Sequence, residues 1–209
     1  MKVLIACEFS QVVTKAFRDI GHEAYSCDIL PTQGNSEWHI QDDVLNHLND
    51  GWDMIIAHPP YTYLCNSGVS HLYKDKSRWD ELRKASEFFK MLLDSKVQRI
   101  CVENPIPHKY GKLPPYSQII QPYEFGHAER KATCLWLKNL PKLEPTQDVY
   151  QQMLKLPKKL SQRIHYTSPG KDRGMLRSIT FQGIAEAMAD QWGSLELTTS
   201  HNFREVMRE

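Results

Sequence analysis

The chain has 209 residues, of which 41% are hydrophobic and 24% charged, and these values are typical of a folded globular domain. The net charge of +1 excludes a global electrostatic attraction to nucleic acid or membrane, so any such attraction must come from local patches. No apolar run approaches the roughly 20 residues that span a bilayer, and no CxxC pair or zinc spacing is found among the cysteines, which are Cys7, Cys27, Cys65, Cys101 and Cys134. We therefore expect one cytoplasmic domain with free thiols and no metal site.

The first 105 residues alternate between strand-like and helix-like segments. Short apolar runs predict strands at 2–6, 22–29, 53–57 and 99–105. Apolar residues at helical spacing predict helices over 11–21, with Ser10 and Gly21 as its caps, and over 77–95, with a short helix or turn over 41–51. Strands and helices that alternate at these lengths predict an α/β fold, in which a parallel sheet is covered by helices on both faces.

The pattern changes after residue 110. Segments 116–125 and 131–140 predict two antiparallel strands that close one edge of the sheet. Residues 150–178 are irregular and basic, whereas residues 183–193 predict a short amphipathic helix. The segment from residue 194 onward has no strong pattern, and we expect it to fray.

Polar segments follow several of the predicted strands. In open α/β sheets, ligands bind at the carboxyl ends of the strands, which lie along one edge. The segments that fall there are CEFSQ (7–11), Asp28, QDD (41–43), HPPY (58–61) and ENP (103–105). Their convergence on one edge predicts a single functional site.

Two of these segments suit a nucleoside cofactor. The backbone N–H groups of CEFSQ are free to bind a ligand, and Asp28 at the end of the second strand can bind two ribose hydroxyls. Asp42 or Asp43 can accept a hydrogen bond from an adenine amino group, although an acid pair before a helix is also commonly an N-cap. No glycine lies between Leu4 and Ile20, so a dinucleotide fingerprint is absent, and the strand-end acids could instead be solvated.

The HPPY and ENP segments suit a nucleobase. Two adjacent prolines fix the loop backbone, so that carbonyl groups can point at a base amino group, and an adjacent tyrosine can stack on a base removed from its duplex. Glu103 can protonate or hydrogen-bond a ring nitrogen, particularly if burial raises its pKa. The alternative is a rigid turn with a packed tyrosine and a structural acid.

The basic stretch predicts contacts with phosphates. Between residues 155 and 177 one acid, Asp172, accompanies seven cations: Lys155, Lys158, Lys159, Arg163, Lys171, Arg173 and Arg177. Cationic side chains neutralise phosphates, and His165 and Tyr166 are available for stacking. A solvated surface loop is the alternative.

Taken together, these motifs resemble a small phage- and prophage-type branch of cytosine-C5 DNA methyltransferase-like proteins, over most of 1–193. The similar segments, in order, are VLIACEFS (3–10) for the first cofactor motif, Asp28 with Ile29 for the ribose-binding acid, HPPYTYLCNSG (58–68) for the catalytic loop, and VENP (102–105) for the Glu-Asn motif that contacts cytosine. EFGHAERKATCLWL (124–137) resembles the strand pair that carries the QxRxR motif, with Glu129, Arg130 and Lys131 as partial matches, and 177–193 resembles the closing region.

The resemblance implies a Rossmann-like class I methyltransferase fold with S-adenosyl-L-methionine as cofactor. It also implies DNA as substrate, either a duplex with a flipped base or a single strand, and a restriction-modification role in a bacterial host cell. The catalytic domain would comprise 1–139 and 178–193, with a short target-recognition-like insert at 140–177 and a C-terminal tail at 194–209. The implied cofactor contacts are Glu8, Phe9, Ser10, Asp28, Ile29, Asp42, Asp43 and His58.

The same resemblance implies the remaining site residues. Catalytic roles fall to His58, Pro59, Pro60, Tyr61, Glu103 and Asn104. DNA contacts fall to Arg130, Lys131, Lys158, Lys159, Arg163, Lys171, Arg173 and Arg177.

One position departs from the family pattern. C5 methylation needs a cysteine thiolate directly after the proline, whereas this chain has Tyr61, a phenol with an ordinary pKa of about 10. HPPY instead resembles the (Asp/Asn/Ser)-Pro-Pro-Tyr motif of amino-methyltransferases, which methylate adenine N6 or cytosine N4 without a covalent intermediate. There a neutral His58 and the Pro59 carbonyl would accept hydrogen bonds from the amine, and Tyr61 would stack on the base. The alternatives are a silenced homologue that still binds cofactor or DNA, and C5 methylation through Cys65.

Overall fold

The computed structural model describes residues 1–170 and 173–195. Its strands are β1 (Lys2–Ala6), β2 (Glu23–Asp28), β3 (His39–Gln41), β4 (Met54–Ala57), β5 (Arg99–Pro105), β6 (Gln118–Ile120) and β7 (Thr133–Lys138). Its helices are α1 (Val12–Asp19), α2 (Arg78–Leu93), α3 (Tyr150–Lys155), α4 (Lys158–Ser161), α5 (Arg173–Ser178) and α6 (Gln182–Gly193).

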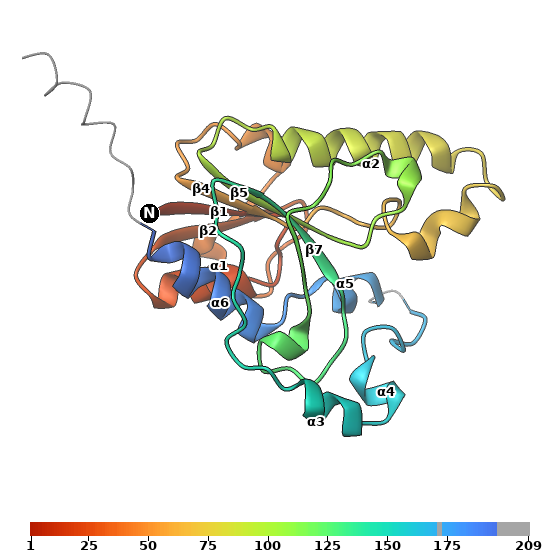
Figure 1. Ribbon diagram of the computed structural model, residues 1–209. Coiled ribbons are helices and arrows are strands. Elements are labelled where there is room, and N and C mark those ends of the chain that lie inside the picture. The colour runs from red at the N-terminus through yellow and green to blue at the C-terminus, as the bar shows by residue number, and fades with distance from the viewer. Residues whose placement is uncertain (171–172, 196–209) are drawn as a thin grey trace, which may run out of the picture.

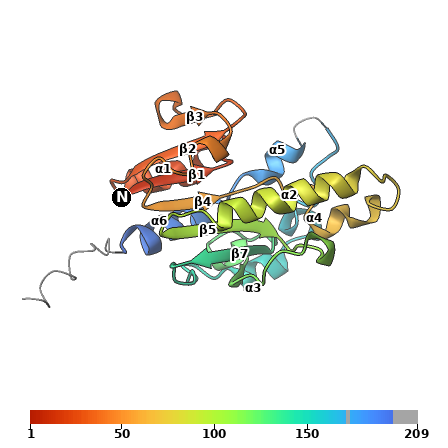
Figure 2. The same cartoon turned by 90° about the horizontal axis from the view of Figure 1, so that it is seen from above.

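The strands form one sheet in the order β3-β2-β1-β4-β5-β7-β6 (Figure 2). β1 is parallel to both β2 and β4, and β5 is parallel to β4, whereas β7 is antiparallel to β5 and β6. The chain therefore builds outward from β1 to β3 and then restarts at β4, which makes the junction of β1 and β4 the topological switch point. The predicted α/β fold, a Rossmann-like and mainly parallel sheet with antiparallel strands at one edge, is confirmed.

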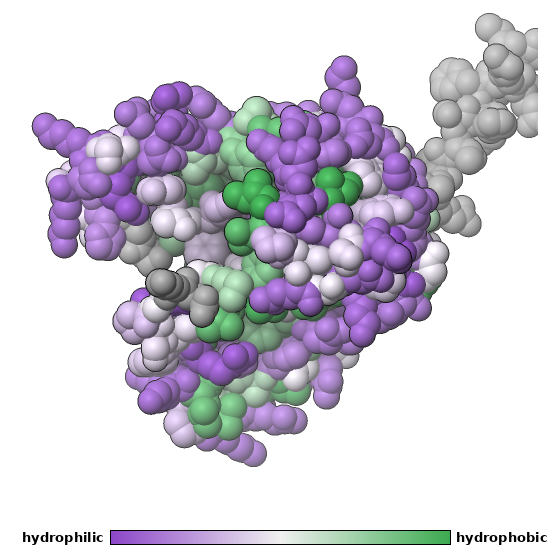
Figure 3. Space-filling view, turned by 180° about the vertical axis from the view of Figure 1, so that it is seen from behind, coloured by the Kyte–Doolittle hydropathy of each residue, from purple (hydrophilic) through white to green (hydrophobic). Residues whose placement is uncertain are grey.

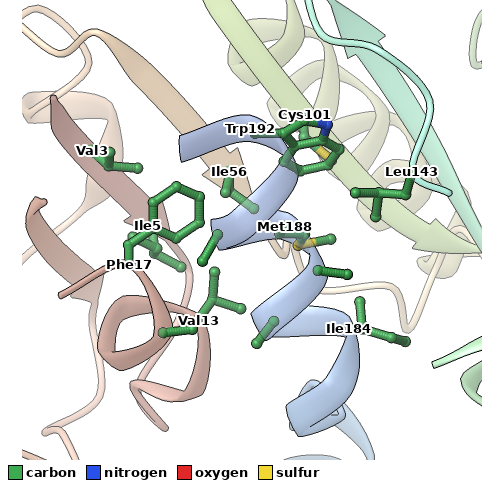
Figure 4. Close-up of a cluster of buried hydrophobic side chains, with 14 of the residues drawn as sticks. Val3, Ile5, Val13, Phe17, Ile56, Cys101, Leu143, Ile184, Met188 and Trp192 are labelled. Atoms are coloured by element: carbon green, nitrogen blue, oxygen red, sulfur yellow. The ribbon is translucent and has the colours of Figure 1, made fainter. Parts of the chain in front are cut away.

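Helices cover both faces of the sheet, with α1 and α6 on one face and α2 on the other (Figure 1). Successive residues of a strand point to opposite faces. Accordingly, Val3 and Ile5 of β1 pack into the core beneath α1 and α6, whereas Leu4 and Ala6 pack into the core beneath α2. In Figure 4, Phe17 of α1 and Trp192 of α6 lie in the first of these cores. Strands β1, β4 and β5 therefore bury apolar side chains on both faces of the sheet.

Of the two predicted caps of α1, Gly21 at the C-terminal end is confirmed and Ser10 at the N-terminal end is not. The structure begins the helix at Val12, and Ser10 does not cap it. Instead the buried carboxylate of Glu8 accepts hydrogen bonds from the backbone N of Val13 (2.8 Å) and Thr14 (3.2 Å). At the other end Gly21 follows the last turn with φ +90°, a conformation that favours glycine.

Other segments differ from the expected boundaries. The strand predicted over 116–125 is only β6, because Pro122 has no N–H for a ladder and starts a 3-10 turn at Pro122–Glu124. The stretch 150–178, predicted to be irregular, contains α3, α4 and α5. The tail predicted over 194–209 lies outside the described residues except for positions 194 and 195.

No helix within residues 1–170 and 173–195 is long and apolar enough to cross a membrane. In the same part of the chain, no group of three or more His, Cys, Asp or Glu side chains is placed to hold a metal ion.

Candidate active site

A cavity of about 990 Å³ lies at the carboxyl edge of the sheet. Residues that follow β1, β2, β3 and β4 line this cavity, and residues of α5 line it as well. Figure 3, seen from behind the view of Figure 1, shows the surface hollowed between two mostly hydrophilic lobes. The predicted site residues that line the cavity are Phe9, Asp28, Ile29, Asp42, Asp43, His58, Pro59, Pro60, Tyr61, Arg173 and Arg177.

An acidic and apolar wall is formed where β2 ends. Asp28 is half-buried, and its Oδ1 accepts a hydrogen bond from the backbone N of Leu30 (2.9 Å). Burial raises the pKa of Asp28, against the opposing effect of that hydrogen bond. The next side chain, Ile29, is 72% exposed although it lies in the cavity wall. A carboxylate beside an exposed apolar side chain matches a ligand with hydroxyl groups and a flat ring.

The two acids after β3 both have local structural partners. Oδ1 of Asp43 accepts a hydrogen bond from the backbone N of Leu45 (3.0 Å), so the N-cap interpretation of this residue is confirmed. Oδ2 of Asp42 lies 3.1 Å from Nε2 of His47. Hydrogen bonds from the backbone N of Asp43 and from His47 lower the pKa of Asp42. Both residues line the cavity, and contact with an adenine amino group stays a prediction.

The loop between β1 and α1 makes its turn without glycine. Cys7 and Gln11 both adopt φ 59°, a left-handed conformation that L-residues rarely take. Phe9 contributes to the cavity wall, whereas Glu8 caps α1 and Ser10 lies with its Oγ 3.4 Å from Oε1 of Glu8. Of the predicted cofactor contacts in this loop, the structure therefore brings only Phe9 to the cavity.

His58 and Glu103 form a buried ion pair. The β4–β5 register pairs Ala57 with Val102, so the next residues on the two strands, His58 and Glu103, are neighbours. Nδ1 of His58 lies 3.1 Å from Oε1 of Glu103, and the side chains are 6% and 13% exposed. The angles fall short of a well-directed hydrogen bond. Nε2 of His58 is also buried and has no hydrogen-bond partner within the described part of the chain.

The electrostatics of this pair differ from what the sequence suggests. Burial alone lowers the pKa of His58, but the Glu103 carboxylate raises it, and the net shift is upward. Burial raises the pKa of Glu103, but His58 and then Lys131 lower it, and the net shift is downward. A raised pKa, which would favour Glu103 as a proton donor, is therefore not found, because a cation lies beside the carboxylate. A carboxylate facing Nδ1 also fixes the His58 proton on that nitrogen.

Tyr61 and Cys65 lie in one tight turn at the cavity. The Tyr61 carbonyl accepts hydrogen bonds from the backbone N of Leu64 (3.0 Å) and Cys65 (3.1 Å), and both Tyr61 and Cys65 line the cavity. Burial raises the pKa of the Tyr61 phenol, against an opposing effect of Arg177. The phenol therefore stays protonated at neutral pH and cannot replace a thiolate as nucleophile.

Two further predicted residues, Asn104 and Lys131, are not among the residues that line the cavity. Asn104 is buried, and its Nδ2 donates to the Pro105 carbonyl (2.5 Å). Burial lowers the pKa of Lys131, and the charge of Glu103 opposes this effect. Lys131 thus lies near the charge of Glu103, and its contact with DNA stays a prediction.

The other predicted DNA contacts are divided between two places. Arg173 and Arg177 of α5 line the main cavity. Lys159 and Arg163 line a second, mostly apolar cavity of about 660 Å³ between α4 and residues 179–181. Nη2 of Arg163 also pairs with Oε1 of Glu129 (2.9 Å). Arg130 and Lys158 are exposed, and Lys171 lies outside the described residues.

Two basic side chains in the cavity wall, His71 and Arg78, were not predicted from the sequence. A physical signal for them exists. The helix that follows a strand in a parallel sheet must start at the carboxyl edge, so the first residues of α2 and the turn before it are close to any ligand there. The presence of a histidine and an arginine at these positions does not by itself indicate that they line a cavity.

The sheet order and the cavity at its switch point define a Rossmann-like α/β protein with a candidate ligand site at the carboxyl edge of the sheet. No protein-family model and no curated protein matches the chain. One similar solved structure is an E. coli protein described as a "putative DNA modification methyltransferase encoded within prophage Cp", with a TM-score of 0.44 and 14% sequence identity. The match covers 70% of this chain and 51% of that one, so this chain spans about half the length of that protein.

Proposed function

We propose that this chain is an S-adenosyl-L-methionine-dependent DNA methyltransferase that transfers a methyl group to the exocyclic amine of cytosine or adenine. One observation carries the proposal. A single cavity joins the strand-end acids, the HPPY loop and the arginines of α5. A methyl donor, a base and a phosphate backbone have to meet in such a space.

The acidic side of the cavity suits the cofactor. The cavity volume of about 990 Å³ lies at the upper end of the range for small-molecule sites, so a nucleoside cofactor and a base both fit. In this proposal Asp28 accepts hydrogen bonds from two ribose hydroxyls and Ile29 and Val44 contact the adenine ring, which is supported by the presence of all three residues in the cavity wall. When bound, the cofactor supplies an electrophilic methyl group on a positively charged sulfur.

The HPPY loop suits a base amine. With its proton fixed on Nδ1 by Glu103, a neutral His58 ring presents the lone pair of Nε2, which has no partner in residues 1–170 and 173–195. In the proposed reaction Nε2 and the Pro59 carbonyl accept hydrogen bonds from the exocyclic amine, and Tyr61 stacks on the base. No covalent intermediate is needed, in agreement with a phenol at position 61.

The basic side of the cavity suits the nucleic acid. Arg173 and Arg177 of α5 line the same cavity as the acids at the ends of β2 and β3. We propose that they neutralise phosphates next to the target base, and that 140–177 acts as a target-recognition-like insert in a catalytic domain of 1–139 and 178–193.

A second function is favoured by the His58–Glu103 pair. The raised pKa of His58 increases the fraction of rings in which Nε2 is protonated and cannot accept a hydrogen bond from an amine. A chain in which this form dominates would bind cofactor or DNA without methylating it. C5 methylation through Cys65, which lines the same cavity, stays a further prediction.

Transfer of labelled methyl groups to DNA tests these functions. Mass spectrometry of the nucleosides identifies the product, and we expect N4-methylcytosine or N6-methyladenine. A C5-methylcytosine product that is lost in Cys65→Ala would contradict the proposal. Cofactor binding by calorimetry without any methyl incorporation between about pH 6 and 9, on both sides of the ordinary histidine pKa, would support the silenced homologue instead.

A further inference from the structure

Three aromatic side chains form an exposed cluster beside the cavity. Tyr73 is 68% exposed and Trp79 is 37% exposed, and their ring centroids are 5.8 Å apart. Tyr110 contacts both rings, with its centroid 5.3 Å from Trp79 and its hydroxyl 2.6 Å from that of Tyr73. We call these three residues the aromatic cluster.

Cations flank the aromatic cluster along the chain, where Lys74 and Lys76 lie between Tyr73 and Trp79 together with one acid, Asp75. Nζ of Lys109 lies 5.4 Å from the ring centroid of Tyr110. Lys74, Lys76 and Lys112 are exposed, and none of them forms an ion pair within the described ranges 1–170 and 173–195. Exposed aromatic rings interleaved with unpaired lysines are the combination that binds the bases and phosphates of a nucleic acid strand.

The aromatic cluster is connected to the cavity. Arg78, which precedes Trp79, lines the cavity, and its guanidinium carbon lies 4.7 Å from the ring centroid of Tyr63. Nε2 of His108 donates to the Tyr63 carbonyl (2.9 Å), and Tyr110 follows two residues later. Arg78 in the cavity wall is therefore connected through Tyr63 and His108 to Tyr110 of the aromatic cluster.

Core packing does not account for this arrangement. Leu82, Phe89 and Leu92 are fully or almost fully buried and attach α2 to the sheet. A ring that is 68% exposed, as in Tyr73, adds little to that attachment. In Figures 1 and 2, α5 and the first turns of α2 lie at the same end of the sheet, and Arg78 of α2 lines the same cavity as the α5 arginines.

We propose that the aromatic cluster binds the single-stranded segment next to the target base, by stacking its unpaired bases on Tyr73 and Trp79 while the surrounding lysines hold its phosphates. The inference rests on the proposed function, because it takes the cavity to be the place where the base reacts. It deepens that function by naming the substrate as DNA with unpaired flanks. Stacking surfaces are buried inside a duplex, so an intact duplex cannot use the cluster.

Fluorescence anisotropy with the full-length chain and no cofactor tests the inference. The probes are a labelled oligothymidylate of about 12 nucleotides, within the usual range of single-strand sites, and a duplex of the same length. We expect the oligothymidylate to bind more tightly. Tyr73→Ala should raise its Kd about 5- to 100-fold, whereas Tyr73→Phe, which keeps the ring, should stay within about twofold.

Two further variants act as controls. Tyr150→Ala removes an exposed tyrosine of α3 that is far from the cluster in sequence and follows an acid, Asp148, rather than lysines. This variant should leave the Kd within about twofold. Lys74→Gln with Lys76→Gln cannot affect the core, since both side chains are exposed, and should reduce the slope of log Kd against log salt by about 0.7 for each phosphate that the lysines no longer neutralise. Urea unfolding checks that each variant is folded.

The inference is overturned if a folded Tyr73→Ala binds the oligothymidylate as well as the unmodified chain, or if the double lysine variant keeps the full salt slope. An equal weakening of duplex and single-strand binding in Tyr73→Ala would also overturn it. Failure of the proposed function is distinguishable from either result. A chain that binds through the cluster but never methylates DNA refutes only the function, and a chain that methylates duplex DNA regardless of Tyr73 refutes only this inference.

Discussion

Replacement of Glu103 by glutamine separates the charge of the buried ion pair from its shape. The glutamine has nearly the same volume and keeps an oxygen that can face Nδ1 of His58. It removes the negative charge that stabilises the protonated ring 3.1 Å away and that also offsets the burial of Lys131. We therefore expect a loss of stability that depends on pH.

The pH window follows from the two pKa shifts. The folded-state pKa of His58 is raised above the ordinary value of about 6.5, so its stabilisation is fully present below that pH and is lost as the pH rises through the raised pKa. The folded-state pKa of Glu103 is lowered, so its stabilisation is present above the ordinary value of about 4.3 and is lost as the pH falls through the lowered pKa. Both contributions are present together between about pH 5 and 6.5.

The size of the effect follows from burial. Removing one partner of a buried pair typically costs about 3–5 kcal/mol. Here the glutamine retains an acceptor and the His58 ring can lose its proton, so we expect about 2–3 kcal/mol at pH 6 and about 1 kcal/mol at pH 8.5. The two side chains are 6% and 13% exposed, and solvent therefore screens little of the interaction.

Equilibrium urea unfolding at both pH values measures this difference. Glu87→Gln is the matched control, because Glu87 pairs with Arg83 at 3.1 Å but the side chains are 56% and 61% exposed. We expect less than about 1 kcal/mol from the control at either pH. If Glu103→Gln were equally destabilised at pH 6 and 8.5, or not destabilised at all, the ion-pair reasoning would be refuted.

Four other outcomes are expected. Methyl transfer should increase as the pH rises through the raised pKa of His58, and this increase should move to lower pH in Glu103→Gln; a pH-independent rate contradicts an Nε2 acceptor. Glu8→Ala should lower the free energy of unfolding by about 2–3 kcal/mol in urea, because buried N–H groups of α1 lose their acceptor. Asp28→Ala should abolish thermal stabilisation by S-adenosylmethionine and S-adenosylhomocysteine, and unchanged stabilisation removes Asp28 from the cofactor site. Cys65→Ala should keep full activity, since a large decrease would support the thiol as nucleophile.

Apolar periodicity predicted the elements that the core requires. β1, β4 and β5 are buried on both faces and α2 and α6 bury one face, so their sequences had to carry the pattern. β3 has only three residues, which are too few to show an apolar alternation, and it is recognised as a strand by its pairing with β2. α3, α4 and α5 have four to six residues each, and so short a helix leaves almost no periodic signal.

The location of the candidate site could be predicted, whereas its internal contacts could not. Parallel strands bring their carboxyl ends to one edge whatever the register, which is why Asp28 and the HPPY loop line one cavity. The neighbours of Glu103 depend instead on the β4–β5 register and on how the turn before β7 folds back. These are long-range properties, and so the lowered pKa of Glu103 and the place of Lys131 were not visible in the sequence.

The loop between β1 and α1 shows why an absent motif is weak evidence against a function. Glycine is favoured there because the backbone needs positive φ, and Cys7 and Gln11 adopt φ 59° despite their side chains. Such a conformation costs about 1–3 kcal/mol per residue. Hydrogen bonds of the Gln11 side chain offset the conformational cost at this residue. Its Nε2 donates to Ser26 Oγ (3.0 Å) and to the Asn35 carbonyl (2.9 Å), and its Oε1 accepts from the backbone N of Asn35 (2.7 Å). The backbone path that a glycine fingerprint encodes can therefore persist without the glycines, and their absence does not argue against a nucleoside cofactor in this cavity.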